Sequence, residues 1–173
     1  MGEHNGAQRR AEVARILEEA AAPVSAAALA RRLSVSRQII VGDVALLRAA
    51  GARILATPRG YLLERRTEGM ERTVACVHTP GETQAELNAI VDAGGEVVDV
   101  IVEHPVYGQL TGELHLQSRY DVAQFIRKIN EEDAHSLSEL TGGTHLHTLR
   151  CPGEELFQKV CEALGNAGYL LKE

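Results

Sequence analysis

Residues 25–51 have the sequence SAAALARRLSVSRQIIVGDVALLRAAG, in which two helical patterns are separated by a very short turn. Ser25 and Ser36 each stand directly before one pattern, and Gly51 follows the second. A serine at this place accepts a free amide of the first helical turn, and a glycine after a helix adopts the left-handed conformation that ends it. Two capped helices joined by Ser34-Val35 therefore predict a helix-turn-helix, in which the second helix enters the major groove of DNA.

A further helix and a hairpin flank this unit. Apolar residues recur at helical spacing over residues 8–21, and Pro23 stops the pattern. Apolar runs at residues 54–56 and 61–63 enclose Thr57-Pro58-Arg59-Gly60, which is typical of a β-hairpin with a turn at its tip. The three helices are expected over residues 8–21, 26–33 and 36–50. Helices followed by such a hairpin form a winged helix-turn-helix, the fold that we predict for this part of the chain.

The start of the third predicted helix carries side chains suited to reading DNA bases. Ser36, Arg37 and Gln38 follow one another there. The planar fork of an arginine matches O6 and N7 of guanine, and the amide of a glutamine matches N6 and N7 of adenine. Arg59, at the tip of the predicted hairpin, is placed to reach a phosphate or the minor groove. The alternative is that these are solvated surface residues, as single arginines and glutamines on helices usually are.

The distribution of charge also divides the chain. Positions 1–66 hold eleven Lys or Arg against six Asp or Glu, a net +5, whereas positions 67–173 hold seven against eighteen, a net −11. Such an asymmetry suggests that the basic part contacts nucleic acid. Because residues 64–72 are polar and separate the two patterns, we predict a DNA-binding domain over residues 1–68 and a second domain over residues 69–173.

The second domain alternates between strand and helix patterns without a strict order. Strands are expected over residues 73–78, 97–102, 109–117 and 144–150, with a possible edge strand at 168–171. Helices are expected over residues 80–93, 121–131 and 152–164, the first opened by Thr79-Pro80-Gly81-Glu82, which resembles a capping box. This order predicts an α+β domain, with helices packed on a largely antiparallel sheet.

Three histidines and a glutamate of this domain are candidate metal ligands. His145 and His147 are two residues apart on a predicted strand, so both side chains project from one face. His78 ends another predicted strand, and Glu86 lies on the helix that follows it. If the two strands are neighbours, these four side chains can surround one divalent ion, with zinc, nickel, iron and manganese all suitable. Alternatively, the two strand histidines form a polar surface, and Glu86 caps a helix that starts at Thr83.

The composition excludes several other classes of protein. No apolar run approaches the roughly 18 residues of a membrane span, and the first residues lack the pattern of a secretory signal, so we expect a cytoplasmic protein. Cys76, Cys151 and Cys161 form no C-x-x-C motif and are expected to be small buried hydrophobic residues. The lack of Trp and the small number of other aromatic residues argue against base stacking on single strands as the mode of binding.

Several motifs resemble those of the niacin-responsive transcription repressors, which join a winged helix-turn-helix to a three-histidine (3H) domain. In the predicted DNA-binding domain, residues 36–48 are similar to this family and to many other winged-helix regulators. The motifs typical of the 3H domain are HPVYG at residues 104–108, SR with DV at residues 118–122, and LTGGTHLHT at residues 140–148. His115 departs from the family pattern, since an apolar residue is expected at its position.

The resemblance implies a site and a ligand. In the family, a metal ion is bound by the residues that correspond to His78, Glu86, His145 and His147, and nicotinic acid binds nearby. We expect one divalent transition metal per chain, with the other end of the effector contacted by His104, Tyr107 or Arg119. In the family, effector binding favours repression of genes for NAD synthesis or niacin uptake.

The resulting hypothesis is a homodimeric repressor, not an enzyme, that binds a palindromic operator with its recognition helices about one helical turn of DNA apart. One alternative is a metalloregulator, in which the metal itself is the signal. A second alternative is a metal-dependent hydrolase, because a bound ion lowers the pKa of its water toward about 7. The absence of a further base within a clear motif argues against the hydrolase.

Overall fold

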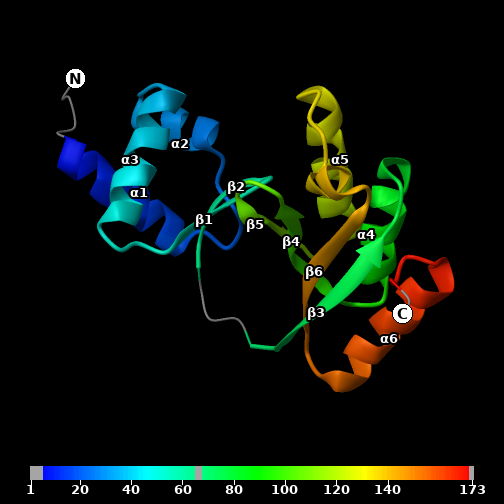
Figure 1. Cartoon of the computed structure of the whole chain (residues 1–173). Helices are drawn as coiled ribbons and strands as arrows, with labels where there is room; N and C mark the ends of the chain where they lie inside the picture. The colour runs from blue at the N-terminus through cyan, green and yellow to red at the C-terminus, as the bar shows by residue number, and fades with distance from the viewer. Residues whose placement is uncertain (1–5, 65–67, 172–173) are drawn as a thin grey trace. The chain divides into compact units, whose positions relative to one another are not determined.

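The computed structural model describes residues 6–64 and 68–171 and divides the chain into two compact units, Met1–Arg66 and Thr67–Glu173 (Figure 1). We refer to them as unit 1 and unit 2. Unit 1 contains α1 (Gly6–Glu19), α2 (Ala26–Leu33), α3 (Arg37–Ala49), β1 (Ile54–Thr57) and β2 (Gly60–Leu63). This order of three helices and a hairpin confirms the fold that the sequence predicts for the first part of the chain.

Both predicted serine caps of unit 1 are present. The Ser25 hydroxyl accepts a hydrogen bond from the Ala28 amide at 3.1 Å, and the Ser36 hydroxyl accepts one from the Ile39 amide at 3.3 Å. Each such cap contributes about 1 kcal/mol to helix stability. Gly51 has a φ of 97°, the positive value expected after the helix end. The turn between α2 and α3 is held by the Ser36 cap on one side and by the Val35 amide on the other, which donates to the Ala30 carbonyl at 3.0 Å.

The core of unit 1 joins all its elements. Its fully or nearly buried members are Val13, Ile16, Leu17, Leu29, Ala30, Ile40, Val44 and Ile54. Burial of each large side chain contributes about 1.5–3 kcal/mol, so the apolar stripes of the three helices fix their packing. The hairpin is tied to the chain before α2 as well, because Val24 and Tyr61 exchange two main-chain hydrogen bonds of 2.8 and 2.9 Å.

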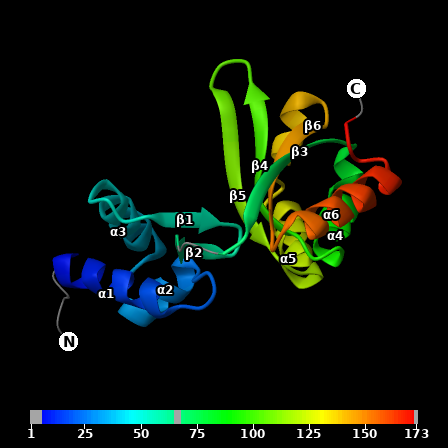
Figure 2. The same cartoon turned by 90° about the horizontal axis from the view of Figure 1, so that it is seen from below.

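Unit 2 is an antiparallel sheet covered on one face by helices (Figure 2). Its strands are β3 (Met70–Val77), β4 (Glu96–His104), β5 (Gly108–Leu116) and β6 (Thr144–Cys151), in the order β3-β6-β4-β5. Its helices are α4 (Thr83–Asp92), α5 (Arg119–Glu131) and α6 (Glu154–Ala167), with 3-10 helices η1 (Pro80–Glu82) and η2 (Leu137–Thr141). The predicted α+β class with an antiparallel sheet is confirmed.

The core of unit 2 lies between the sheet and the three α-helices. Leu87 and Ile90 of α4, Val122 of α5 and Val160 of α6 pack against the strands. The predicted capping box is present, since the Glu82 carboxylate accepts from the Thr79 amide at 2.9 Å. None of the helices within the described residues is long and apolar enough to cross a membrane.

Two segments of unit 2 differ from the expectation. The segment predicted as an edge strand makes one isolated bridge, between Cys76 and Leu170, in place of a strand. In addition, η2 lies in a stretch for which the sequence predicts no element. The first segment depends on its bridge to β3, whereas η2 opens with a local capping box of Ser136 and Glu139 that is too short to show an apolar periodicity.

Candidate functional site

The first turn of α3 presents the predicted DNA-contacting residues to solvent. Ser36 caps the helix, and the side chains of Arg37 and Gln38 are exposed directly after it. Arg59 lies in the two-residue turn between β1 and β2, and its amide donates to the Thr57 hydroxyl at 3.3 Å. The structure therefore brings the first three together on one helix end and places Arg59 at the tip of the wing.

A buried ion pair orients α3 in unit 1. Asp43 of α3 is 3% exposed, and its carboxylate accepts from Arg9 of α1 at 2.6 and 3.2 Å. A second arginine, Arg10, lies 3.8 Å from the same carboxylate. This contact is not predictable from the sequence, because nothing near an aspartate within a helix marks a partner 34 residues away. Its role is to hold the helix that carries Arg37 and Gln38 against α1.

The four predicted metal ligands lie close together in unit 2. His78 directly follows β3, Glu86 lies in the first turn of α4, and His145 and His147 lie on β6. The strands β3 and β6 are antiparallel neighbours, as the proposed convergence requires. The exposed fractions are 8% for His78, 1% for Glu86, 3% for His145 and 2% for His147. The alternative of a polar surface formed by the two strand histidines is therefore excluded.

The Nε2 atoms of the three histidines converge on the Glu86 carboxylate. Nε2 of His78 lies 2.8 Å from Oε2, Nε2 of His145 lies 3.2 Å from Oε1, and Nε2 of His147 lies 3.4 Å from Oε2. Glu86 consequently does not cap a helix start at Thr83. We call these four residues the His3Glu cluster.

The opposite nitrogens of the three rings are held by main-chain carbonyls. Nδ1 of His78 lies 2.7 Å from Thr79 O, Nδ1 of His145 lies 2.8 Å from Gly143 O, and Nδ1 of His147 lies 2.6 Å from Asp99 O. A carbonyl oxygen can only accept, so each Nδ1 carries a proton. Each Nε2 of a neutral ring then presents a lone pair to Glu86. This orientation by outer partners is typical of histidines that bind metals.

The charges of the cluster favour a cation. With neutral rings, three nitrogen lone pairs face the carboxylate oxygens without a proton between them. With three protonated rings, the buried cluster would hold a net +2 charge, and each uncompensated buried ion costs several kcal/mol. A divalent ion among three neutral imidazoles and one carboxylate resolves both difficulties, and this donor set suits zinc, nickel, iron and manganese. The residues present therefore fit the predicted metal.

In the metal-free cluster, the pKa shifts favour a protonated ring beside the carboxylate, because each group stabilises the charged form of the other. Burial opposes ionisation of Glu86, but the ring nitrogens of His145, His147 and His78 outweigh it and hold the pKa of the carboxyl far below its ordinary value. Burial also opposes protonation of His78, whereas its contacts with Glu86 and Thr79 raise the pKa of the ring above its ordinary value. The carboxylate is thus kept charged within an enclosed site.

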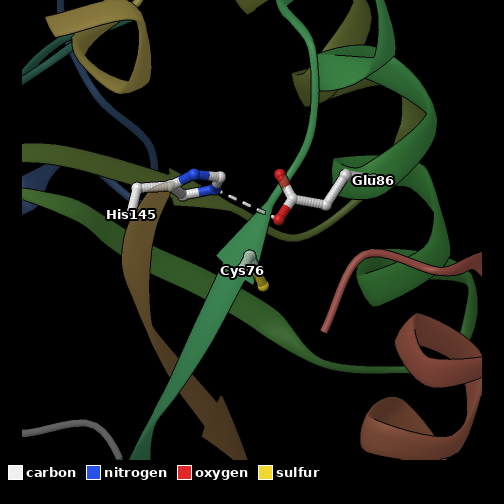
Figure 3. Close-up of side chains that lie close together, drawn as sticks. All are labelled: Cys76, Glu86 and His145. Atoms are coloured by element: carbon white, nitrogen blue, oxygen red, sulfur yellow. Dashed lines mark hydrogen bonds and ion pairs between the residues drawn. The ribbon is translucent and has the colours of Figure 1, made fainter. Parts of the chain in front are cut away.

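Cys76 is a further neighbour of the cluster that the sequence analysis treated only as a hydrophobic residue. It is the Cα partner of His145 across β3 and β6, and it is fully buried. One potential ligand atom from each of Cys76, Glu86 and His145 lies within 4.8 Å of the others (Figure 3). Burial, followed by the charge of Glu86, raises the pKa of its thiol. Strand alternation places Cys76 and His78 on one face, a signal that could have identified this neighbour.

A small cavity of about 30 Å³ adjoins the His3Glu cluster. Its walls include Leu87, Val100, Leu114, Phe125 and the η2 region, of which Ser136 and Ser138 are the polar members. An apolar pocket with a few polar groups is the usual form of a small-molecule site. None of these wall residues was predicted from the sequence, since they come from five separate elements.

The structure does not bring the three predicted effector residues to this cavity. His104 is the last residue of β4, and its Nδ1 accepts from the Val106 and Tyr107 amides of the following turn at 3.1 and 3.3 Å. Tyr107 is 75% exposed at that turn. Arg119 is exposed at the start of α5 and forms a bidentate ion pair with Asp92 of α4. His104 and Tyr107 thus stabilise or extend from the turn after β4, and Arg119 links the surfaces of α5 and α4.

A second ionic network surrounds His115. The backbone of His115 has a positive φ of 51°. Its ring contacts two carboxylates, with Nδ1 3.1 Å from Glu96 and Nε2 2.8 Å from Glu113. Arg150 donates to Glu96 at 2.8 Å and also pairs with Glu71. The contact with Glu96 is the main cause that raises the pKa of His115. Because both ring nitrogens face carboxylates, the protonated ring satisfies this site best.

Comparisons with known proteins agree with this architecture. The 3H domain family matches residues 71–173, and an HTH domain family matches residues 9–62. The chain is 45% identical over 166 residues to the "Probable transcription repressor NiaR" of Thermotoga maritima, covering 96% of this chain and 95% of that repressor. It is 44% identical over 172 residues to the "Transcription repressor NadR" of Bacillus subtilis, covering 97% and 96%. The role that both names state is regulatory and not enzymatic, and the resemblance predicted from the sequence is confirmed. The chain therefore belongs to the 3H-domain family of helix-turn-helix transcription repressors.

Proposed function

We propose that this repressor binds nicotinic acid beside a divalent transition metal in unit 2, and that this binding controls genes for NAD synthesis or niacin uptake. The convergence of three histidine Nε2 atoms on the buried Glu86 carboxylate, next to a cavity, carries the proposal. The metal-binding residues would be His78, Glu86, His145 and His147. A bound ion would supply positive charge and coordination positions for a pyridine nitrogen or a carboxylate.

The chain would contribute the rest of the effector site. The apolar cavity walls suit the flat face of a pyridine ring. The Ser136 hydroxyl donates to Glu139 at 3.2 Å, whereas the Ser138 hydroxyl, which lies 2.9 Å from that of Ser136, can turn its one proton to a carboxylate. A pyridine carboxylate is larger than a cavity of about 30 Å³, so binding requires η2 or another wall to move. That requirement provides a means of control, because an effector shifts an equilibrium only through different affinities for two arrangements.

On the DNA side, we propose a cytoplasmic homodimer that places two copies of α3 in successive major grooves of a palindromic operator. Arg37 and Gln38 would contact base edges, Ser36 the backbone, and Arg59 a phosphate or the minor groove. The exposure of Ser36, Arg37 and Gln38 at the start of α3 supports this assignment. Half-sites about one helical turn apart would match the symmetry of such a dimer.

Thermal melts of metal-loaded and chelator-stripped protein, with nicotinate, nicotinamide or quinolinate, test the proposal. A ligand at 100 times its dissociation constant adds about 2.7 kcal/mol to the stability of the unit that binds it. This corresponds to a rise in Tm of about 12 °C for a unit of about 100 residues. We expect this rise with nicotinate only when metal is present.

His145→Ala is the critical variant, and His135→Ala is its control, because His135 is exposed and contacts only Glu139 in the described hydrogen bonds. The variant at His145 should lose both metal and effector-dependent DNA binding, whereas the control should keep them. If His145→Ala retains both, the proposal is wrong. If metal alone changes DNA affinity and none of the three pyridines shifts the melt, the chain is a metalloregulator instead.

A further inference from the structure

His147 differs from the other two histidines of the cluster in what holds its ring. The carbonyls that accept from His78 and His145 belong to Thr79 and Gly143, one and two residues away in the chain. The carbonyl that accepts from His147 belongs to Asp99, 48 residues away on β4. The orientation of this one ring therefore depends on the conformation of a neighbouring strand.

The strand β4 has a bulge at this level. Val97 pairs with Leu149 of β6, but the next described pair joins Ile101 to Leu146, so β4 has one residue more than β6 between the two pairs. Val97, Val98 and Asp99 are all buried, which regular alternation does not allow. A bulge of this kind redirects main-chain groups and leaves a ladder group without its usual partner.

The Asp99 side chain closes the gap that the bulge leaves. Its Oδ1 accepts a hydrogen bond from the Thr148 amide at 2.9 Å, and Thr148 directly follows His147. In the same residue, the main-chain oxygen accepts from Nδ1 of His147 at 2.6 Å. One residue of β4 thus holds both the backbone after His147 and the ring of His147. Asp99 is a buried residue with an exposed fraction of 9%, so water competes little for these bonds.

We infer that Asp99 is a positioning residue of the metal site: its carboxylate fixes the β4 bulge against β6, and the bulge turns its carbonyl toward the ring of His147. The bond to this carbonyl keeps the proton on Nδ1 and leaves the Nε2 lone pair directed at the His3Glu cluster. The inference rests on the proposed metal site. It assigns a role to a residue outside the four ligands, as outer partners of metal-binding histidines commonly have.

The substitution Asp99→Ala tests this role, with Asp99→Asn as the conservative variant. Alanine removes the acceptor for the Thr148 amide, whereas asparagine retains a side-chain oxygen at the same place. Loss of an outer partner lowers metal affinity by about 10- to 100-fold. We expect a loss of this size for Asp99→Ala and an affinity close to that of the unchanged protein for Asp99→Asn, measured by competition between the protein and a zinc-binding dye.

Asp121→Ala is the matched control. Asp121 is also a buried carboxylate of unit 2, 6% exposed, and it accepts a main-chain amide, that of Gln117, at 3.0 Å. It has no described bond to the His3Glu cluster. A general loss of stability should therefore be similar in both alanine variants, as urea unfolding of the stripped proteins would measure, while only Asp99→Ala should weaken zinc binding.

A measurement on the unchanged protein covers the case in which Asp99→Ala does not fold. Nitrogen NMR of the stripped protein at alkaline pH reports which nitrogen of His147 carries the proton, and we expect Nδ1. Protonation at Nε2, equal zinc affinity of Asp99→Ala and the unchanged protein, or an equal loss in Asp121→Ala would each overturn the inference. If the unchanged protein binds none of zinc, nickel, iron or manganese, the proposed metal site fails first, and this inference fails with it.

Discussion

Replacement of Glu86 by glutamine should affect the metal-free and the metal-loaded forms of the His3Glu cluster differently. In the metal-free protein, the carboxylate faces three Nε2 atoms at 2.8 to 3.4 Å. The amide of Glu86→Gln has the same shape and can donate a hydrogen bond to one of these nitrogens. At alkaline pH, where the three rings are neutral, the stability of the stripped protein should therefore not fall. In the metal-loaded protein, the same change removes the only anionic side chain of the four proposed ligands.

The loss of metal affinity can be bounded from the charge. Two unit charges about 4 Å apart interact by about 4 kcal/mol at an effective dielectric constant of 20. A 100-fold loss of affinity, about 2.7 kcal/mol, is therefore a conservative expectation. At a metal concentration 100 times the original dissociation constant, the stabilisation by metal then falls from about 2.7 to about 0.4 kcal/mol. A metal-dependent rise in Tm of about 12 °C should shrink to about 2 °C.

Scanning calorimetry of stripped and zinc-loaded protein measures this difference. Glu82→Gln is the control, because Glu82 lies one turn earlier, is exposed, and bonds to Thr79. It should leave the metal-dependent rise unchanged. A full metal-dependent rise in Glu86→Gln would refute the argument that the carboxylate holds the ion. At alkaline pH, a stripped Glu86→Gln protein that unfolds well below the unchanged one would refute the argument that lone pairs oppose each other in the cluster.

Three other predictions follow from the structure. A Cβ at Gly143, which has a φ of 96°, would lie 2.2 Å from the His78 carbonyl oxygen. Gly143→Ala should therefore lower the free energy of unfolding in urea more than Gly142→Ala does. Gly142 has a φ of 62° and open space around it, so about 1–2 kcal/mol is expected there. Equal losses in the two variants would contradict this. Arg37→Ala should weaken operator binding by about 1–3 kcal/mol and reduce the preference for one base at its position. Arg59→Ala should weaken binding to all DNA sequences and reduce the slope of log affinity against log salt concentration by about one. DNA titrations at several salt concentrations would measure both effects. His115→Gln should lower stability most below about pH 6.5, because the raised pKa of folded His115 adds stability that is lost as pH rises through that pKa; a constant difference in Tm from the unchanged protein across pH 5 to 9 would exclude this role.

The parts of the molecule that the sequence predicts are those fixed by local rules. Ser25 and Ser36 act as caps because a serine hydroxyl reaches an amide three residues on, wherever the helix packs. His145 and His147 share a face because strand side chains alternate. The resemblance supplied the remaining condition, that His78 and Glu86 come to the same place, and the pairing of β3 with β6 meets it.

The parts that the sequence does not predict depend on strand register and on small irregularities. The β4 bulge that brings Asp99 to His147 arises from one additional residue relative to β6, and no periodic pattern marks it. The effector contact of Arg119 stays a prediction. An arginine in a typical motif suggested effector binding, but its partner is Asp92, 27 residues earlier, on a helix that packs against its own. Chemical type alone could not distinguish a ligand contact from an ion pair between helices.

The segment from Ser138 to His145 connects the cavity with the His3Glu cluster. Ser138 lines the cavity, and its carbonyl accepts from the Gly143 amide at 2.9 Å. The Gly143 carbonyl in turn accepts from Nδ1 of His145 at 2.8 Å and from the His78 amide at 3.4 Å. A ligand that enlarges the cavity by moving η2 must therefore act on the same short chain of bonds that orients two of the proposed metal ligands. Because coupling between two sites is reciprocal, a metal held by those histidines would in turn favour one position of the cavity wall.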